Sequence, residues 1–140
     1  MGSVKQPTNW QNVPADITKY VGFTYLIVNK INEQKYIGKK FFWFTNRIKV
    51  EGRKNRKKVV TESDWRTYES SDDEVKSDIA KFRKENFDFI ILKCYTDKRS
   101  LTYAETELQF KRDVLTKKLP NGLHEYYNKS IGGKYFRQTL

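Results

Sequence analysis

The sequence predicts a small α/β (α+β) fold, a three-layer sandwich in which a short, mainly antiparallel three-stranded sheet is flanked by helices. Apolar runs rich in β-branched and aromatic residues, at residues 23–28 and 87–95, are typical of strands. Segments that begin at Ser71 and near Ser100 carry apolar residues at helical spacing, which is typical of amphipathic helices. A chain of 140 residues is long enough for one such domain with a modest core.

The first twenty residues predict an irregular N-terminal arm. They are polar, and Pro7 and Pro14 interrupt any continuous helix or strand. Met1-Gly2-Ser3 could be an expression scar and is left out of the fold prediction. Trp10 is the large apolar residue expected to hold the arm against the body.

The first two strands are expected to form a hairpin. Residues 23–28 supply one strand and residues 35–37 the other, and a four-residue turn over residues 29–32 joins them. In that register Tyr25 lies directly opposite Tyr36, so both phenols share one face of the sheet.

Residues 21–140 are expected to form the domain proper, with a basic insertion at about residues 45–62. Between residues 47 and 58 seven cationic side chains stand against Glu51 alone, and Gly52 near the centre of this stretch predicts a hairpin tip or a mobile loop. The insertion is either a solvated loop or an arm that grips phosphates, and its clustered charge favours the arm. Its cationic residues are Arg47, Lys49, Arg53, Lys54, Arg56, Lys57 and Lys58.

The first helix is expected to begin at Ser71. Ser71 and Glu74 have the spacing of a capping box, and the apolar residues that follow, Val75, Ile79 and Phe82, fall on one helical face. This face should therefore pack against the sheet.

A central strand and a second helix are expected next. Residues 87–95 form the strand, the helix runs from about residue 100 to 117, and residues 120–122, Pro-Asn-Gly, end it. The helix should bury Leu101, Ala104, Leu108 and Leu115. Cations near its C-terminal end, where they suit the helix dipole, are Lys111, Arg112, Lys117 and Lys118.

Charge and composition indicate a nucleic-acid partner. Lys and Arg number 28 against 17 Asp and Glu, a net charge of +11, and a surface this basic attracts polyanions. No apolar run approaches the roughly 20 residues that cross a bilayer, so no membrane partner is expected. The single cysteine, Cys94, cannot form an internal disulfide, and no secretory signal is present. Both observations favour a cytoplasmic location, which would be the host cytoplasm for a phage protein.

Several catalytic classes are excluded by what the sequence lacks. His124 is the only histidine, so a centre built from several imidazoles, or a zinc site of Cys and His ligands, is not available. No nucleophile elbow accompanies His124, and no phosphate-binding P-loop motif is present. Hydrolysis would have to rest on tyrosine, lysine, arginine and few carboxylates.

One short motif stands out in what remains. Tyr36-Ile37-Gly38 is followed by Lys39 and Lys40, and about ten residues earlier Tyr25 precedes an apolar run. The paired arrangement resembles the GIY and YIG strands of the GIY-YIG nucleases. The first strand differs from the family's Gly-Ile-Tyr motif, because it reads Phe23-Thr24-Tyr25.

Later residues extend this resemblance over residues 22–133. The family carries a glutamate on a downstream helix and an asparagine near the C-terminus, and Glu105 and Asn128 fit these places. Two motifs resemble those of small phage-encoded, Seg-like homing endonucleases: Tyr-Ile-Gly-Lys-Lys at residues 36–40 and Asp-Trp-x-x-Tyr-x-x-Ser at residues 64–71.

The resemblance implies a DNA endonuclease with Glu105 as the one protein ligand of Mg²⁺ or Mn²⁺. Mg²⁺ keeps most of its water shell, so a single carboxylate suffices. Tyr25 would activate water, which requires nearby lysine charge and a metal-bound network to lower its pKa from about 10. Tyr36 would position water or phosphate, and Gly38 would let the backbone approach closely. Asn128 would hold the site together by hydrogen bonds.

Each of these residues also has a purely structural interpretation. Tyr25 and Tyr36 could be packing partners, Gly38 could end a strand, Glu105 could complete a capping box, and Asn128 could be a turn residue. All of them in family order favour the catalytic interpretation.

The arginine that the family aims at the phosphate has three possible counterparts. Arg47 has roughly the expected sequence distance, Arg66 has the more helical setting, and Lys40 could supply the charge instead. The sequence leaves this choice open.

Further DNA contacts are expected from residues around the motif. Ser70 and Ser71 follow Tyr68 at a helix start, where backbone N–H groups bind phosphate, although a capping role is equally good. The expected nucleic-acid-binding residues are Lys39, Lys49, Arg53, Lys54, Arg56, Lys57, Lys58, Tyr68, Ser70 and Ser71.

These features predict a metal-dependent endonuclease of homing or DNA-degrading type that acts on double-stranded DNA. A single site cuts one strand at a time, so the protein should act as a monomer or as a transient dimer on DNA. The alternatives are a non-catalytic basic module that binds nucleic acid, and action on structured DNA or RNA.

Overall fold

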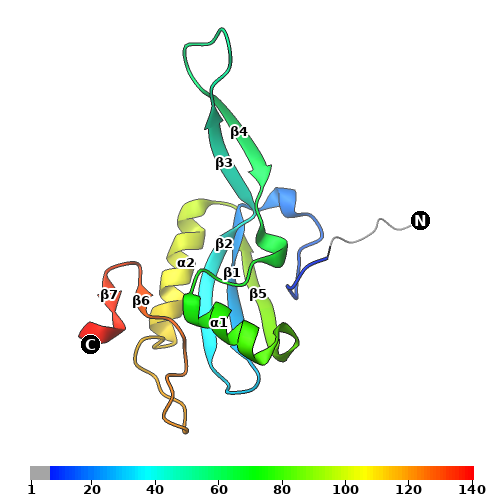
Figure 1. The fold of residues 1–140 in the computed structure, drawn as a ribbon. Helices are drawn as coiled ribbons and strands as arrows, with labels where there is room; N and C mark the ends of the chain where they lie inside the picture. Colours follow the sequence, from blue (N-terminus) through cyan, green and yellow to red (C-terminus); the bar gives the residue numbers. More distant parts are fainter. Residues whose placement is uncertain (1–6) are drawn as a thin grey trace.

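A computed structural model describes residues 7–140 and places a three-stranded antiparallel sheet between two helices (Figure 1). The strands are β1 (Gly22–Asn29), β2 (Lys35–Phe41) and β5 (Phe87–Tyr95), in the order β2-β1-β5. The helices are α1 (Asp73–Phe82) and α2 (Lys98–Lys111), which cover opposite faces. The predicted α+β fold is therefore confirmed, while Met1-Gly2-Ser3 lies outside the described residues.

Two small strand pairs complete the fold. A ribbon of β3 (Trp43–Ile48) and β4 (Lys57–Glu62) extends from the body, and β6 (Ser130–Ile131) pairs with β7 (Tyr135–Phe136) near the C-terminus (Figure 1). Short 3-10 turns lie at Ile17–Lys19, Trp65–Thr67, Lys84–Asn86 and Arg137–Thr139. Among residues 7–140, no helix combines the length and the apolar character needed to span a bilayer.

The hairpin forms as expected, but its predicted register is wrong by two residues. Tyr25 lies opposite Gly38, and Tyr36 lies opposite Ile27. Asn29, expected in the turn, instead continues β1, because its side chain is buried and hydrogen-bonded to the Tyr127 hydroxyl. A two-residue slip keeps every side chain on its original face, so Tyr25 and Tyr36 still share one face.

The strand β5 lies at one edge of the sheet, and β1 is the central strand instead. The N-terminal arm covers that edge: Gln11 N–H donates to Phe89 O at 2.8 Å, and Ile91 N–H donates to Gln11 O at 3.1 Å. Backbone groups of β5 that would face solvent are thereby satisfied by the chain's own arm.

Two apolar clusters fill the spaces between the layers. The larger lies on the α1 face and is rich in aromatic rings; its buried members are Trp10, Phe23, Tyr25, Ile27, Phe42, Trp65, Val75, Ile79, Phe87, Phe89, Ile91 and Tyr127. The smaller lies on the α2 face and comprises Ile37, Val114, Leu115, Tyr126 and Ile131. From β1, Phe23, Tyr25 and Ile27 lie in the larger cluster and Leu26 packs against the smaller one, as the alternation of side chains along a strand requires.

The first helix starts one residue later than the Ser71 capping box predicts. Asp72 is the N-cap, and its carboxylate accepts hydrogen bonds from the N–H groups of Glu74 and Val75. Val75 and Ile79 are buried as expected, and Phe82 is partly buried.

The second helix is shorter than predicted because the chain turns sharply after Lys111. Asp113 has a positive φ of 51°, and Val114 and Leu115 then fold back into the smaller cluster. Leu115 is therefore buried without being helical. Residues 117–122 lie in the loop beyond this turn, so Pro-Asn-Gly at 120–122 does not end the helix.

The anchoring of the N-terminal arm by Trp10 can be tested directly. Its ring is 5% exposed, packs edge-on against three other rings, and donates from Nε1 to Trp65 O at 2.6 Å. Trp10→Ala should lower the free energy of unfolding by about 3–5 kcal/mol, the usual cost of deleting a buried indole. Urea denaturation of this variant and of Tyr103→Ala, a 70% exposed control, measures the difference. Equal midpoints for the two variants would contradict the anchoring role.

Candidate active site

The candidate site is a pocket of about 300 Å³ that wraps around the outer edge of β2. Tyr36, Gly38 and Lys40 belong to the α1 face of this strand, whereas Lys39 belongs to the α2 face and meets Glu105 there. The pocket is lined by Tyr25, Tyr36, Gly38, Lys39, Lys40, Phe41, Phe44, Tyr68, Ser71 and Glu105. Residues from β1, β2, β3, α2 and the segment before α1 therefore meet at one place.

Gly38 makes room for the Tyr25 phenol. A Cβ atom on Gly38 would lie 2.6 Å from the Tyr25 hydroxyl oxygen, closer than real Cβ atoms come to their neighbours. Tyr36 lies diagonally across the same face, with 6.0 Å between its ring centroid and that of Tyr25. Glycine at this position is thus a packing requirement of the tyrosine pair, which the sequence suggested only as close backbone approach.

Both phenols of the pair are held in their protonated form. Burial raises the pKa of Tyr25 well above its ordinary value, and the neighbouring Tyr36 and Tyr68 add to this effect. Burial also raises the pKa of Tyr36 to about 12, although a hydrogen bond with Ser71 opposes the shift. Burial is the largest influence on the pKa of Tyr25 in the protein alone, and the expected lowering by lysine charge together with a metal-bound network stays a prediction.

Two lysines supply the positive charge of the pocket. The Lys40 ammonium forms an ion pair with Asp64 at 2.6 Å and lies 4.1 Å from the centroid of the Tyr68 ring. The Lys39 ammonium lies 3.0 Å from Glu105 Oε1. Both side chains are largely buried, so their charges are less screened than those of free surface lysines.

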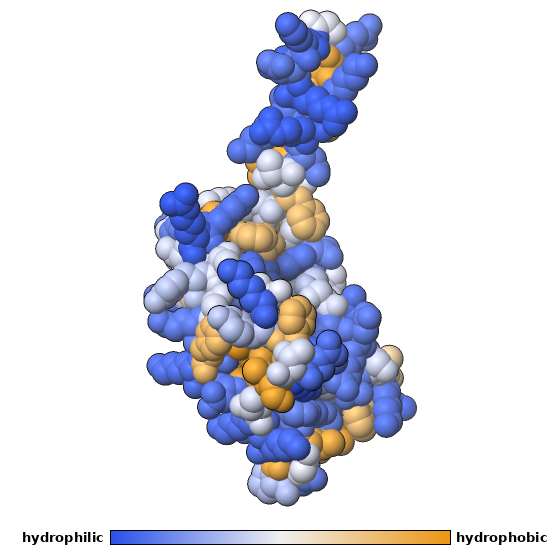
Figure 2. Space-filling model, turned by 90° about the vertical axis from the view of Figure 1, so that its left-hand side faces the viewer, coloured by the Kyte–Doolittle hydropathy of each residue, from blue (hydrophilic) through white to orange (hydrophobic). Residues whose placement is uncertain are grey.

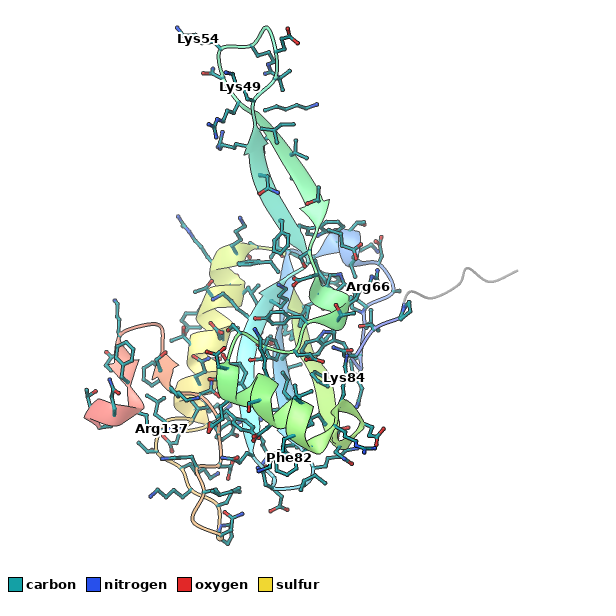
Figure 3. All side chains as sticks on the ribbon, viewed as in Figure 1. Lys49, Lys54, Arg66, Phe82, Lys84 and Arg137 are labelled. Atoms are coloured by element: carbon teal, nitrogen blue, oxygen red, sulfur yellow. The ribbon has the colours of Figure 1, made fainter. Side chains whose placement is uncertain are left out.

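Of the three counterparts considered for the phosphate arginine, Lys40 is the one that lines the pocket. Arg47 is exposed on the ribbon, where it pairs with Lys58 across the strands. Arg66 donates to Glu62 at 2.9 Å and covers the Trp65 ring (labelled in Figure 3). The pocket therefore brings together lysines where the resemblance suggested an arginine.

Asn128 holds the edge of β2 with its side chain. Its amide nitrogen donates to Ile37 O at 2.8 Å, and its amide oxygen accepts from Ile37 N–H at 3.1 Å, as the backbone of a neighbouring strand would. Gln109 adds a third contact, from its amide nitrogen to Ile37 O at 3.1 Å. Both side chains are buried, so this polar arrangement is satisfied within the protein.

Glu105 is the residue of the site that could hold a divalent cation of the Mg²⁺ class. It lies one helical turn before Gln109 and lines both the main pocket and an adjoining polar pocket of about 190 Å³. Oε1 faces Lys39, and for Oε2 no hydrogen bond is found among residues 7–140. These residues contain no group of three or more His, Cys, Asp or Glu side chains arranged around a metal position. A lone carboxylate suits Mg²⁺, which retains water and takes substrate oxygens, better than it suits metals that need several protein ligands.

The two serines before α1 occupy different environments. Ser70 is fully buried with a positive φ of 92°, and its hydroxyl accepts from Asp72 N–H. Ser71 is exposed at the pocket beside Tyr36. Two N–H groups at the start of α1, those of Glu74 and Val75, bind the Asp72 carboxylate, and the expected phosphate contact through this helix terminus stays a prediction.

The remaining residues expected to bind DNA lie away from the pocket. Lys49 and Lys54 are at the far end of the ribbon (Figure 3), and Arg53, Arg56, Lys57 and Lys58 are exposed on the same projection. The ribbon is thus a separate surface, connected to the pocket through Phe44 at its base.

Four residues of the site were not singled out from the sequence: Gln109, Asp64, Phe41 and Phe44. Gln109 follows Glu105 by four residues, so helical spacing could have placed both on one face. Asp64 appears only as part of a motif, and nothing in the sequence indicates its pairing with Lys40. Phe41 and Phe44 stand in an aromatic run that gives no sign of which rings reach the pocket.

Comparison with known proteins gives one match. Residues 5–131 match the family model described as "Putative endonuclease segE, GIY-YIG domain", which covers the sheet, both helices and all residues of the candidate pocket. No curated protein and no solved structure matches the chain.

The tight fit between Gly38 and Tyr25 predicts an energetic coupling. Gly38→Ala should lower the free energy of unfolding by about 1–3 kcal/mol, because the added methyl group overlaps the phenol. The same change in a Tyr25→Leu background should cost less, since both the hydroxyl oxygen at 2.6 Å and the ring carbon Cζ at 2.7 Å are gone. Urea denaturation of the four proteins gives the coupling, and costs that simply add would contradict the fit.

The raised pKa of Tyr36 predicts a loss of stability in alkaline solution. Its folded pKa of about 12 lies above the value of about 10 expected in the unfolded chain. The contribution is therefore complete below pH 10 and disappears between pH 10 and 12, at up to about 1.4 kcal/mol per pH unit. Urea midpoints measured in EDTA across this range should fall less steeply for Tyr36→Phe than for Tyr103→Phe, the exposed control. Parallel curves would show that Tyr36 does not make this contribution.

Proposed function

Because the chain belongs to the GIY-YIG endonuclease family, of the Seg-like type, we propose that it hydrolyses phosphodiester bonds of double-stranded DNA with Mg²⁺ or Mn²⁺ as cofactor. The observation that carries the proposal is the pocket around β2, which combines one carboxylate, two ammonium groups and three phenols. Such a set matches the needs of the reaction: a hydrolytic water, neutralised phosphate charge and a stabilised leaving oxygen.

Glu105 is the proposed metal ligand. A bound Mg²⁺ would lower the pKa of a coordinated water and offset the charge that develops on the phosphate. The Lys39 ammonium lies 3.0 Å from the same carboxylate, so it and a bound cation would both neutralise the charge of Glu105. Lys39 is expected to turn towards a substrate phosphate when the cation is bound, because two positive charges at one carboxylate repel.

Lys40 is the proposed phosphate-binding group. Asp64 and the Tyr68 ring hold its ammonium at the pocket, which reduces the conformational entropy lost when substrate binds. Unlike an arginine, the ammonium acts as a point charge without a bidentate geometry. Backbone groups that face outward alternate along an edge strand, so the N–H of Lys39 faces away from β1, as that of Ile37 does. The Lys39 N–H is therefore a further proposed donor to phosphate.

Tyr25 and Tyr36 are proposed to act first as hydrogen-bond donors. Their raised pKa values keep the phenols protonated from neutral into alkaline solution, so they can donate hydrogen bonds that orient the attacking water or a phosphate oxygen. Tyr36 is the more accessible of the two, and Tyr25 occupies the space that the missing side chain of Gly38 leaves free. For Tyr25 to take a proton from water, its own phenol would first have to be deprotonated. That would require positive charge that the protein alone does not place beside it.

One such pocket per chain would cut one DNA strand at a time. A double-strand break then requires a second event or a second copy, which is why we propose a monomer or a transient dimer on DNA. A non-catalytic module that binds DNA through its basic surface is the alternative, and the Lys39–Glu105 ion pair, complete without a metal, is compatible with it.

Cleavage of supercoiled plasmid tests the proposal. The parent protein with Mg²⁺ should nick the plasmid, EDTA should abolish the reaction, and Glu105→Ala should reduce the rate at least about a hundredfold. Glu107→Ala is the matched control, because Glu107 is an exposed glutamate on the same helix that does not line the pocket.

Two other outcomes would count against the proposal. Equal plasmid retardation by parent and Glu105→Ala without any cutting favours the non-catalytic module. Equal cutting by Glu105→Ala and Glu107→Ala removes Glu105 from the metal site.

A further inference from the structure

The β3–β4 ribbon (residues 43–62) has no place in the chemistry proposed above, apart from Phe44 at its base. The two strands pair with each other over six residues each and extend away from the three-stranded sheet (Figure 1). All side chains of both strands are exposed except Trp43 and Val59, which are partly buried. A two-stranded ribbon without a core is marginally stable by itself, so this surface is suited to a partner that supplies further contacts.

Charge identifies the kind of partner. Residues 47–58 carry seven cations and a single acid, Glu51, and the space-filling view shows a hydrophilic column standing on the body (Figure 2). A polyanion would release counterions from this surface on binding, which favours association strongly at low salt.

The ribbon also exposes apolar side chains between its charges. Ile48 is 46% exposed and Val60 is 56% exposed. Asn46 lies two residues before Ile48 on one face of the ribbon, and Arg47 shares the other face with Val60. Asn46 can make paired hydrogen bonds to adenine, and Arg47 can make them to guanine. Apolar contacts with thymine methyl groups and bidentate contacts with purines are available together only in the major groove.

The base of the ribbon is continuous with the pocket. Phe44 lines the pocket, and because side chains alternate along a strand, Asn46 and Ile48 follow it on the same face. Six residues at about 3.3 Å each extend roughly 20 Å, the length of about six base pairs. The ribbon therefore begins at the site of cleavage and ends well to one side of it.

From these observations we propose that the ribbon lies in the major groove of duplex DNA, on one side of the phosphate held in the pocket. This inference rests on the proposed function for its partner, DNA, and adds the groove, the face and the direction. The major groove admits a two-stranded ribbon, whose right-handed twist follows the groove. The tip residues Lys49, Arg53 and Lys54 contact phosphates at the far end of this path.

Binding measured in EDTA tests the ribbon separately from cleavage. The probe is a fluorescein-labelled 30-base-pair duplex, titrated at several salt concentrations. A triple Lys49→Gln, Arg53→Gln, Lys54→Gln variant should bind at least tenfold more weakly at 0.15 M salt. The slope of log Kd against log salt should become shallower by about 2–3, since each lost phosphate contact contributes about 0.9.

The matched control removes the same charge elsewhere. Lys76, Lys81 and Lys111 are exposed on α1 and at the end of α2, away from the ribbon. Their triple replacement by Gln should leave the slope within about one unit of the parent's. Equal losses in the two triple variants would overturn the proposal, because net charge alone would then explain binding.

Ligands that occupy known grooves test the orientation. The parent should displace methyl green, a major-groove dye, from the duplex and leave netropsin, a minor-groove ligand, in place. Displacement of netropsin instead would overturn the groove assignment, and tip-dependent binding to phosphatidylserine vesicles without tip-dependent DNA binding would assign the ribbon to lipid.

The failure of the two proposals can be distinguished. If the parent fails to cut plasmid but its duplex binding depends on the tip residues, the nuclease proposal fails and the ribbon assignment holds. If the parent cuts plasmid and the tip variant binds duplex as the control variant does, the ribbon assignment fails alone.

Discussion

The hydrogen bonds of Ile37 with Asn128 and Gln109 are the constraint on which the candidate site depends. They satisfy the outward-facing backbone groups of Ile37 with two side chains, so no further strand is needed at this point of the β2 edge. Because that edge stays narrow, Lys39 on one face and Tyr36 and Lys40 on the other can reach the same pocket. A paired strand along β2 would separate the tyrosines from Glu105, and the site could not form.

The electrostatics of the pocket follow from its partial burial. Buried phenols keep their protons, whereas the ammonium groups of Lys39 and Lys40 are balanced by Glu105 and Asp64. Each cation therefore has an acidic partner before substrate arrives. A phosphate would enter a pocket of preformed donors and would compete only with these two ion pairs.

The sequence predicts the elements of this fold better than their junctions. Local patterns were sufficient for β5 and for the buried face of α1, because apolar periodicity reports burial directly. The end of α2 was missed because it depends on Val114 and Leu115 folding back, which is a tertiary effect. The hairpin register was missed because the burial of Asn29 against Tyr127 comes from a residue far along the chain. The site residues were gathered by the family motif, while the choice among Arg47, Arg66 and Lys40 needed the distances in space.

Both edges of the three-stranded sheet are covered by segments from the ends of the chain. Gln11 pairs along β5, while Glu125 and Tyr127 pair with Lys35 and Asn128 caps Ile37 along β2. Exposed edges are the places where sheets join to one another and aggregate. The longer unpaired edges in the described part of the chain belong to the ribbon, whose dense positive charge repels a second copy. The N-terminal arm and the segment around Asn128 thus protect the sheet from strand-to-strand association with other molecules.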